Sequence, residues 1–131
     1  MLKYIQKAAI WTGLTAGFVL SAGQAWAAGN TAAGAQLFQS QCAMCHATTP
    51  GMAGIGPSLA GVYGEPAAST AGYDFSPALK SAHLVWNVAT LNKFLKSPQS
   101  TVPGTKMPYS GLPSVGQRAD LIAYLVSLKG K

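Results

Sequence analysis

The segment Cys42-Ala43-Met44-Cys45-His46 decides how this chain is interpreted. Its two thiols are three positions apart, and a histidine directly follows the second one. In this arrangement both vinyl groups of a haem can become thioethers, while the imidazole reaches the iron from the same side. The segment therefore predicts one haem c, attached covalently through Cys42 and Cys45 and ligated by His46.

Three other readings of the two cysteines are open at this point. A thioredoxin-type redox pair requires a βαβ context, which the sequence does not show. A structural zinc site requires four ligands, and His83 is the one further nitrogen or sulfur ligand of the usual kinds. A plain disulfide across two residues is the third alternative.

The second axial ligand of the iron is predicted to be Met107. This residue lies in a loop that prolines and a glycine stiffen, and Pro108 keeps it out of helical geometry. Met44 and Met52 lie too close in sequence to the attachment segment to reach the other face of the haem. His83 is the alternative, which would give two histidine ligands, but we expect it to be exposed in a loop.

The first 27 residues have the pattern of a secretory signal peptide. Lys3 and Lys7 precede an uncharged apolar run over 8–20, and small residues at Ala25 and Ala27 mark a cleavage site. The alternative is that this segment is retained as a membrane anchor, although the run is short for a span. We therefore expect cleavage after Ala27, a periplasmic location and one domain over 28–131.

The composition fits one compact, loop-rich domain. The chain has 131 residues with 49% hydrophobic and only 9% charged residues, together with 15 glycines and 8 prolines. This length makes a two-domain enzyme improbable, the apolar content argues against disorder, and two cysteines exclude a multi-disulfide framework. A domain of this size is marginally stable alone, so a large apolar cofactor would help to complete its core.

Periodicity predicts three main helices. They cover about 31–41, about 87–96, and a last helix from about 115, with Ser114 and Gln117 as a capping box and Gly130 as the stop. The stretches 48–72 and 101–113 are too rich in glycine and proline for regular structure. Because no useful strand pattern occurs, the predicted fold class is all-α with long irregular connections.

The chain resembles class I c-type cytochromes of the small mitochondrial and bacterial kind. The resemblance implies three main helices and long loops wrapped around one covalently bound haem, with the first helix crossing the last one. It is carried by motifs in order: Gly34, Phe38, Cys42 to His46, Gly56-Pro57, Leu59, Gly61, Trp86, Pro103 to Met107, Arg118, Leu121 and Tyr124.

The same resemblance implies two supporting roles near the haem. The carbonyl of Pro57 would accept the Nδ1 proton of His46 and so fix the orientation of the ring. Trp86 would donate its indole N–H to a buried propionate. The chain departs from the family pattern at four positions. The family commonly has Arg, Tyr, Asn and Tyr where this chain has, in the same order, Glu65, Phe75, Leu79 and Phe94. The pocket should therefore hold fewer hydrogen bonds.

Docking lysines should be few. The family steers its partners with lysines around the haem edge, and Lys106 is the one basic residue of this chain at a matching position. Residues 28–79 contain no Lys or Arg. We therefore expect partners to dock on an apolar patch near Pro108 and Tyr109.

His/Met ligation leaves the iron no open position, so oxygen or peroxide chemistry is disfavoured and one-electron transfer remains. The prediction is a soluble, monomeric electron carrier, not an enzyme, that shuttles electrons between periplasmic or membrane redox partners such as an oxidase, reductase or dehydrogenase. We expect no nucleic-acid partner, and no membrane span after signal cleavage. Two alternatives are a ligand-binding or catalytic haem module with a displaceable sixth ligand, and a haem module permanently docked to an oxidase or dehydrogenase.

Overall fold

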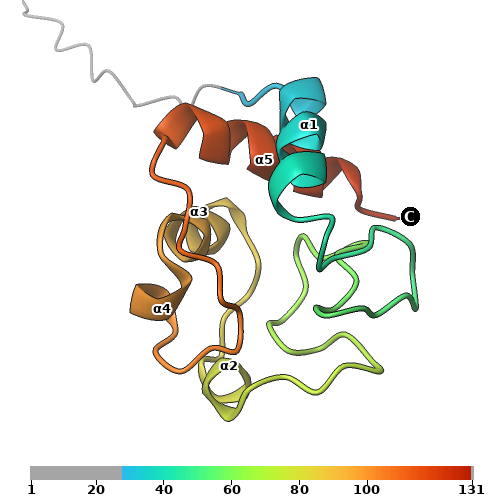
Figure 1. Ribbon diagram of the computed structural model, residues 1–131, viewed down its shortest axis with the longest axis vertical. Helices are drawn as coiled ribbons and strands as arrows, with labels where there is room; N and C mark the ends of the chain where they lie inside the picture. The colour runs from blue at the N-terminus through green and yellow to red at the C-terminus, as the bar shows by residue number, and fades with distance from the viewer. Residues whose placement is uncertain (1–27, 131) are drawn as a thin grey trace, which may run out of the picture.

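A computed structural model describes residues 28–130 of the chain. The predicted signal peptide of residues 1–27 lies outside the described residues, as does Lys131. The described part contains five helices and no extended sheet (Figure 1), so the all-α prediction is confirmed. The helices are α1 (Thr31–Gln41), α2 (Pro77–Ser81), α3 (Val88–Lys96), α4 (Pro98–Thr101) and α5 (Val115–Ser127).

Helices α1 and α5 cross at one end of the molecule (Figure 1). The crossing is close because Gly34 has no side chain: a Cβ there would collide with the backbone carbonyl of Asp120. One turn further on, the rings of Phe38 and Tyr124 pack with their centroids 5.4 Å apart. The carboxylate of Asp120 also accepts a 2.7 Å hydrogen bond from the backbone N–H of Asn30. The helix crossing that the resemblance implied is confirmed.

Side-chain caps explain where the predicted helices begin. Asn30 caps α1 by accepting from the N–H of Ala33, and Asn87 and Thr90 form a reciprocal capping box at α3. At α5 the hydroxyl of Ser114 accepts from Gln117 N, the backbone half of the predicted box. Helix α5 ends at Ser127, and the predicted stop, Gly130, lies in the turn that follows.

The structure adds two short helices, α2 and α4, that the sequence analysis missed. Each begins with a proline, whose missing N–H costs nothing in the first turn of a helix. The hydroxyl of Ser76 also caps α2 by accepting from the N–H of Leu79 at 3.1 Å. With five and four residues, these helices are too short to show a hydrophobic period.

The segment from Cys42 to Ser76 has no helix and follows an irregular path, as the glycine and proline content predicted. One of its links to the helical part is an isolated antiparallel bridge between Pro66 and Val85. Gly61 and Gly64 adopt positive φ angles of 64° and 90°, which other residues rarely adopt. Among residues 28–130, no helix has the length and apolar character needed to cross a membrane.

Candidate functional site

A cavity of about 290 Å³ lies between the irregular segment and the loop that precedes α5. Its walls include the buried core residues Phe38, Leu91 and Leu121, so the hydrophobic core surrounds it. All of the predicted site residues line this cavity: Cys42, Cys45, His46, Pro57, Trp86 and Met107. Residues that are far apart in the sequence are therefore brought to one site.

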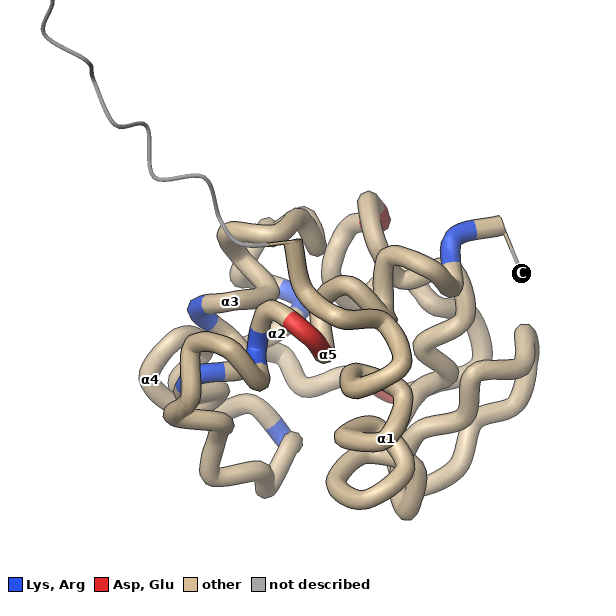
Figure 2. The backbone as a smooth tube through the Cα atoms, turned by 90° about the horizontal axis from the view of Figure 1, so that it is seen from above, with Lys and Arg blue, Asp and Glu red and all other residues tan. Residues whose placement is uncertain are grey.

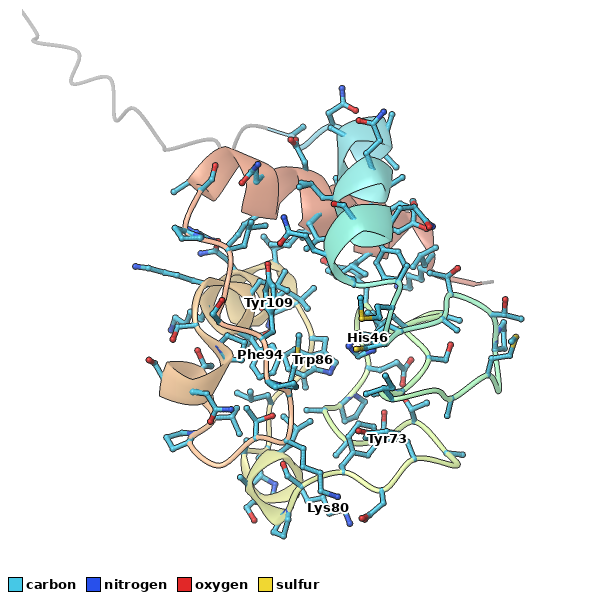
Figure 3. The ribbon with its side chains drawn as sticks, in the orientation of Figure 1. His46, Tyr73, Lys80, Trp86, Phe94 and Tyr109 are labelled. Atoms are coloured by element: carbon cyan, nitrogen blue, oxygen red, sulfur yellow. The ribbon has the colours of Figure 1, made fainter. Side chains whose placement is uncertain are left out.

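His46 is held in one orientation by its backbone neighbours. Its Nδ1 lies 2.8 Å from the carbonyl oxygen of Pro57. Because a carbonyl only accepts, Nδ1 must carry a proton, so in the neutral imidazole Nε2 is the nitrogen that keeps its lone pair. Gly56 lies so close to the ring that a Cβ there would be 2.6 Å from Cε1 of His46. Figure 3 shows the imidazole pointing from the irregular segment toward the centre of the molecule.

The end of α1 positions the two thiols. The N–H of Cys42 donates to the carbonyl of Phe38 at 2.8 Å, and the N–H groups of Cys45 and His46 both donate to the carbonyl of Cys42. Burial, followed by the nearby Cys45, raises the pKa of the Cys42 thiol to about 11. Both cysteines are free, so the structure does not contain the disulfide that the sequence left open.

A structural zinc site is not formed either. Within residues 28–130 no group of three or more His, Cys, Asp or Glu side chains is arranged to hold a metal ion. His83, which the zinc and two-histidine alternatives both require, is exposed and adopts a positive φ of 49° in a turn after α2. It is not among the residues that line the cavity.

Met107 is half-buried at the cavity wall and packs against the core. The side-chain amide of Gln99 fixes its backbone by donating to the carbonyls of Thr105 and Met107 at 2.9 and 3.2 Å. The rival methionines lie elsewhere: Met44 is 88% exposed and Met52 is 57% exposed, and neither lines the cavity. The structure thus leaves Met107 as the methionine at the site.

Trp86 forms part of the wall opposite His46 in Figure 3 and is buried. Its backbone N–H donates to the carbonyl of Glu65, and its carbonyl accepts from Gly64 N. Its ring packs against Phe94 with the centroids 5.0 Å apart. Within the described residues the indole N–H has no protein acceptor, so it is free to bind a group in the cavity.

The cavity fits a flat, largely apolar macrocycle with a central metal. Most of the lining is apolar, and an imidazole, a thioether and two thiols are among the donor groups on its walls. Cys42 and Cys45 would hold a haem by its vinyl groups, while His46 and Met107 would hold its iron. The apolar wall includes Phe38, Val62, Phe75, Leu79, Leu91, Phe94, Leu95, Leu121 and Leu125.

Two polar contacts at the cavity were missed by the sequence analysis. The hydroxyl of Tyr109 donates to Oε1 of Gln41 at 2.6 Å, and the ammonium of Lys106 lies 2.8 Å from Oδ2 of Asp74. Hydrogen bonds from Lys106 and then Lys80 lower the pKa of the exposed Asp74 carboxyl. The two residues of each contact are 68 and 32 positions apart in the sequence, respectively, so no local sequence pattern predicts either contact.

Lys106, the basic residue at the position that matches a docking lysine, forms an ion pair with Asp74 while its side chain stays half-exposed, so its role in docking stays a prediction. The prediction of fewer hydrogen bonds in the pocket concerned four other positions, and several hydroxyl residues do line the cavity, among them Tyr73 next to Phe75. Its hydroxyl, however, donates to the carbonyl of Ile55 at 3.1 Å. It therefore ties two loops together.

Comparison with known proteins gives a consistent result. The family model described as "Cytochrome c" matches residues 31–129. Cytochrome c of Euglena viridis is 43% identical over 101 residues, which cover 77% of this chain and 99% of that protein. Cytochrome c2 of Rhodomicrobium vannielii is 43% identical over 108 residues, covering 82% and 86% of the two chains. The structure of cytochrome cH from Methylobacterium extorquens superposes with a TM-score of 0.71 at 41% identity, covering 76% of this chain and 99% of that one.

Proposed function

Since this chain belongs to the cytochrome c family, whose members are electron carriers rather than enzymes, we propose that it shuttles single electrons between redox proteins through a haem ligated by His46 and Met107. The family carries one covalently bound haem c, and Cys42 and Cys45 have the spacing that this attachment requires. Bound haem supplies reversible one-electron chemistry at its iron. The protein supplies the ligands, the orientation and the apolar surroundings.

The observation that carries the proposal is the contact between His46 and Pro57. By accepting the Nδ1 proton, the Pro57 carbonyl leaves Nε2 as the nitrogen that can bind iron and increases its basicity. Met107 lines the same cavity, and its thioether is a soft ligand that favours ferrous iron. With two protein ligands the iron would have no position for oxygen, which favours electron transfer over oxygen chemistry.

The proposal includes where the protein works. The signal-peptide pattern of residues 1–27 supports export and cleavage after Ala27, which would place a domain of residues 28–131 in the periplasm. Haem c is attached outside the cytoplasm, so export is consistent with the Cys42-to-His46 motif. The donor and acceptor proteins would be other redox proteins of that compartment or of its membrane, and the carrier would act as a monomer.

The test is to replace the proposed sulfur ligand. We expect the oxidised wild-type protein to show the near-infrared absorption band of a methionine bound to ferric iron. In Met107→Ala the band should disappear, and a redox titration should give a lower reduction potential, because a thioether that favours ferrous iron is lost. Met52→Ala is the matched control and should change neither property, because Met52 lies on the surface.

Two results would contradict the proposal. A band that persists in Met107→Ala would assign another ligand. Absence of the band from the wild-type protein, together with rapid binding of carbon monoxide by the ferrous form, would favour the alternative of a ligand-binding or catalytic haem module.

A further inference from the structure

The segment that carries Met107 belongs mechanically to the α3–α4 side of the cavity. We call residues 105–109 the methionine segment. Gln99 of α4 holds two of its carbonyls, at Thr105 and Met107. Just beyond it, the N–H of Leu112 donates to the carbonyl of Leu95 in α3 at 2.8 Å. These bonds join the segment to α3 and α4.

Two side chains reach from this segment to the other wall of the cavity. Lys106 donates to the carboxylate of Asp74 at 2.8 Å and to the backbone carbonyl of the same residue at 2.9 Å. Tyr109 donates to the side-chain oxygen of Gln41, which is the last residue of α1 and directly precedes Cys42. The two contacts flank Met107 in sequence.

No other hydrogen bond within residues 28–130 joins the methionine segment to residues 28–75. Both contacts lie on the outside of the molecule, because Gln41, Asp74 and Lys106 are exposed and Tyr109 is half-buried. An opening of the cavity that carried Met107 away from His46 would have to break both of them.

We propose that these two contacts are ties that hold the methionine segment closed, and that they set how often an outside ligand can reach the sixth position of the iron. Asp74 and Gln41 are then positioning residues: they touch neither ligand but act through Lys106 and Tyr109. The inference rests on the proposed function, because it takes Met107 to be the ligand that must be displaced.

The measurement is the rate at which imidazole displaces the methionine in the oxidised holoprotein, followed by loss of the near-infrared band. At saturating imidazole this rate equals the rate of opening. Asp74→Ala should raise it about two- to fivefold, the range for an exposed ion pair. Tyr109→Phe, which keeps the ring and removes the hydroxyl, should raise it about two- to tenfold.

Double variants test whether the two residues of each tie act through the same contact. Gln41→Leu should raise the opening rate as Tyr109→Phe does, and combining the two should add nothing further, because both remove the same bond. Asp74→Ala combined with Tyr109→Phe should multiply the two increases, because the ties are independent. Lys106→Arg should keep a rate near that of the wild type, because the guanidinium can replace the ammonium.

Lys80→Gln is the matched control for charge. Lys80 lies 3.4 Å from the same Asp74 carboxylate but belongs to α2 and does not touch the methionine segment. Its loss should leave the opening rate unchanged. About 0.5 M salt should raise the wild-type rate toward that of Asp74→Ala and leave Asp74→Ala unaffected, because the ion pair is screened and the Tyr109 bond is not.

The inference is overturned if Asp74→Ala and Tyr109→Phe open at the wild-type rate, or if Lys80→Gln opens as fast as Asp74→Ala. In both cases the near-infrared band of the unliganded variants would still show methionine ligation, so the proposed function would stand. If the wild-type protein lacks the band, the proposed function and this inference fail together.

Discussion

The two walls of the cavity are built on different principles. The attachment wall, residues 42–75, contains no helix and is shaped by glycines, turns and single backbone hydrogen bonds. The methionine wall, residues 76–113, contains α2, α3 and α4, which are fixed by caps and by prolines at helix starts. The attachment wall contains the two cysteines of the haem-attachment motif, whereas the methionine wall contains Met107, the proposed sulfur ligand of the iron.

The walls differ in charge as well. The attachment wall has Glu65 and Asp74 and no basic residue, whereas the methionine wall has Lys80, Lys93, Lys96 and Lys106. Figure 2 shows Lys and Arg positions, drawn in blue, around α2, α3 and α4. From this comparison we expect covalent attachment to stabilise the irregular wall, whereas the methionine wall has capped helices and presents the positive charge.

The largest effect should come from removing a covalent link. Cys45→Ser should prevent formation of a stable holoprotein with the normal spectrum, because one thioether is lost and the attachment wall has little regular structure of its own. The measurement is the yield of covalently bound haem together with thermal unfolding. A Cys45→Ser protein with normal yield and stability would show that the wall does not depend on this bond.

The stability of the methionine wall can be tested through Arg118, which lies on α5 and donates hydrogen bonds to that wall. Its guanidinium is buried at 4% exposure and donates to Asn92, Leu112 and Pro113, each at 2.7 Å. Arg118→Leu should lower the free energy of unfolding by about 2–4 kcal/mol, because it leaves the buried carbonyl of Leu112 and the half-buried side chain of Asn92 without this donor. Denaturant unfolding of the holoprotein checks this.

Gln117→Leu is the control for that experiment, because Gln117 is exposed one position earlier on α5. Its unfolding free energy should stay within about 0.5 kcal/mol of the wild type. Equal losses in the two variants would mean that α5 tolerates leucine poorly at this end, and that the Arg118 hydrogen bonds are not responsible.

The sequence predicted most of the regular structure, and it did so through local signals. In the structure, the three main helices are each preceded by a residue whose side chain caps the helix: Asn30, Asn87 and Ser114. Helices α2 and α4 were not predicted, because a helix of about one turn contains no repeat of apolar residues. The bond from His46 to Pro57 came from resemblance to the family, since spacing alone does not place a carbonyl beside a ring nitrogen.

The two ties could not have been predicted from one sequence. Gln41 and Tyr109, and likewise Asp74 and Lys106, become neighbours only when the chain closes around the cavity. Lys106 illustrates the difficulty: the resemblance matched its position to a docking lysine, but its ion pair depends on an aspartate in another loop.

Partner docking should test what the difference in charge between the two walls contributes to function. Because Lys106 is paired with Asp74, we expect electron transfer to a partner to depend only weakly on salt, with contact made through Pro108 and Tyr109 at the cavity edge. Tyr109→Ser should slow the transfer severalfold, as measured by stopped-flow kinetics over a range of ionic strength. A steep salt dependence that Lys106→Glu abolishes would show that the lysine steers partners in spite of its ion pair.

The smallest effect concerns acid. Hydrogen bonds from Lys106 and Lys80 lower the pKa of Asp74 in the folded protein, so its stabilising contribution is complete above the unfolded pKa of about 4 and is lost as the pH falls through the lower folded value. Asp74→Asn should therefore be slightly less stable than wild type at pH 6, and the difference should vanish in strong acid. The chain has only 3 Asp and Glu residues, so the wild-type holoprotein should remain folded down to about pH 4. Thermal unfolding of both proteins between about pH 2 and pH 6, the range of about two units on either side of the carboxyl pKa, makes the measurement. If the difference in stability between Asp74→Asn and the wild type instead widens as the pH falls, the pH dependence has the opposite sign. Another group would then dominate the titration.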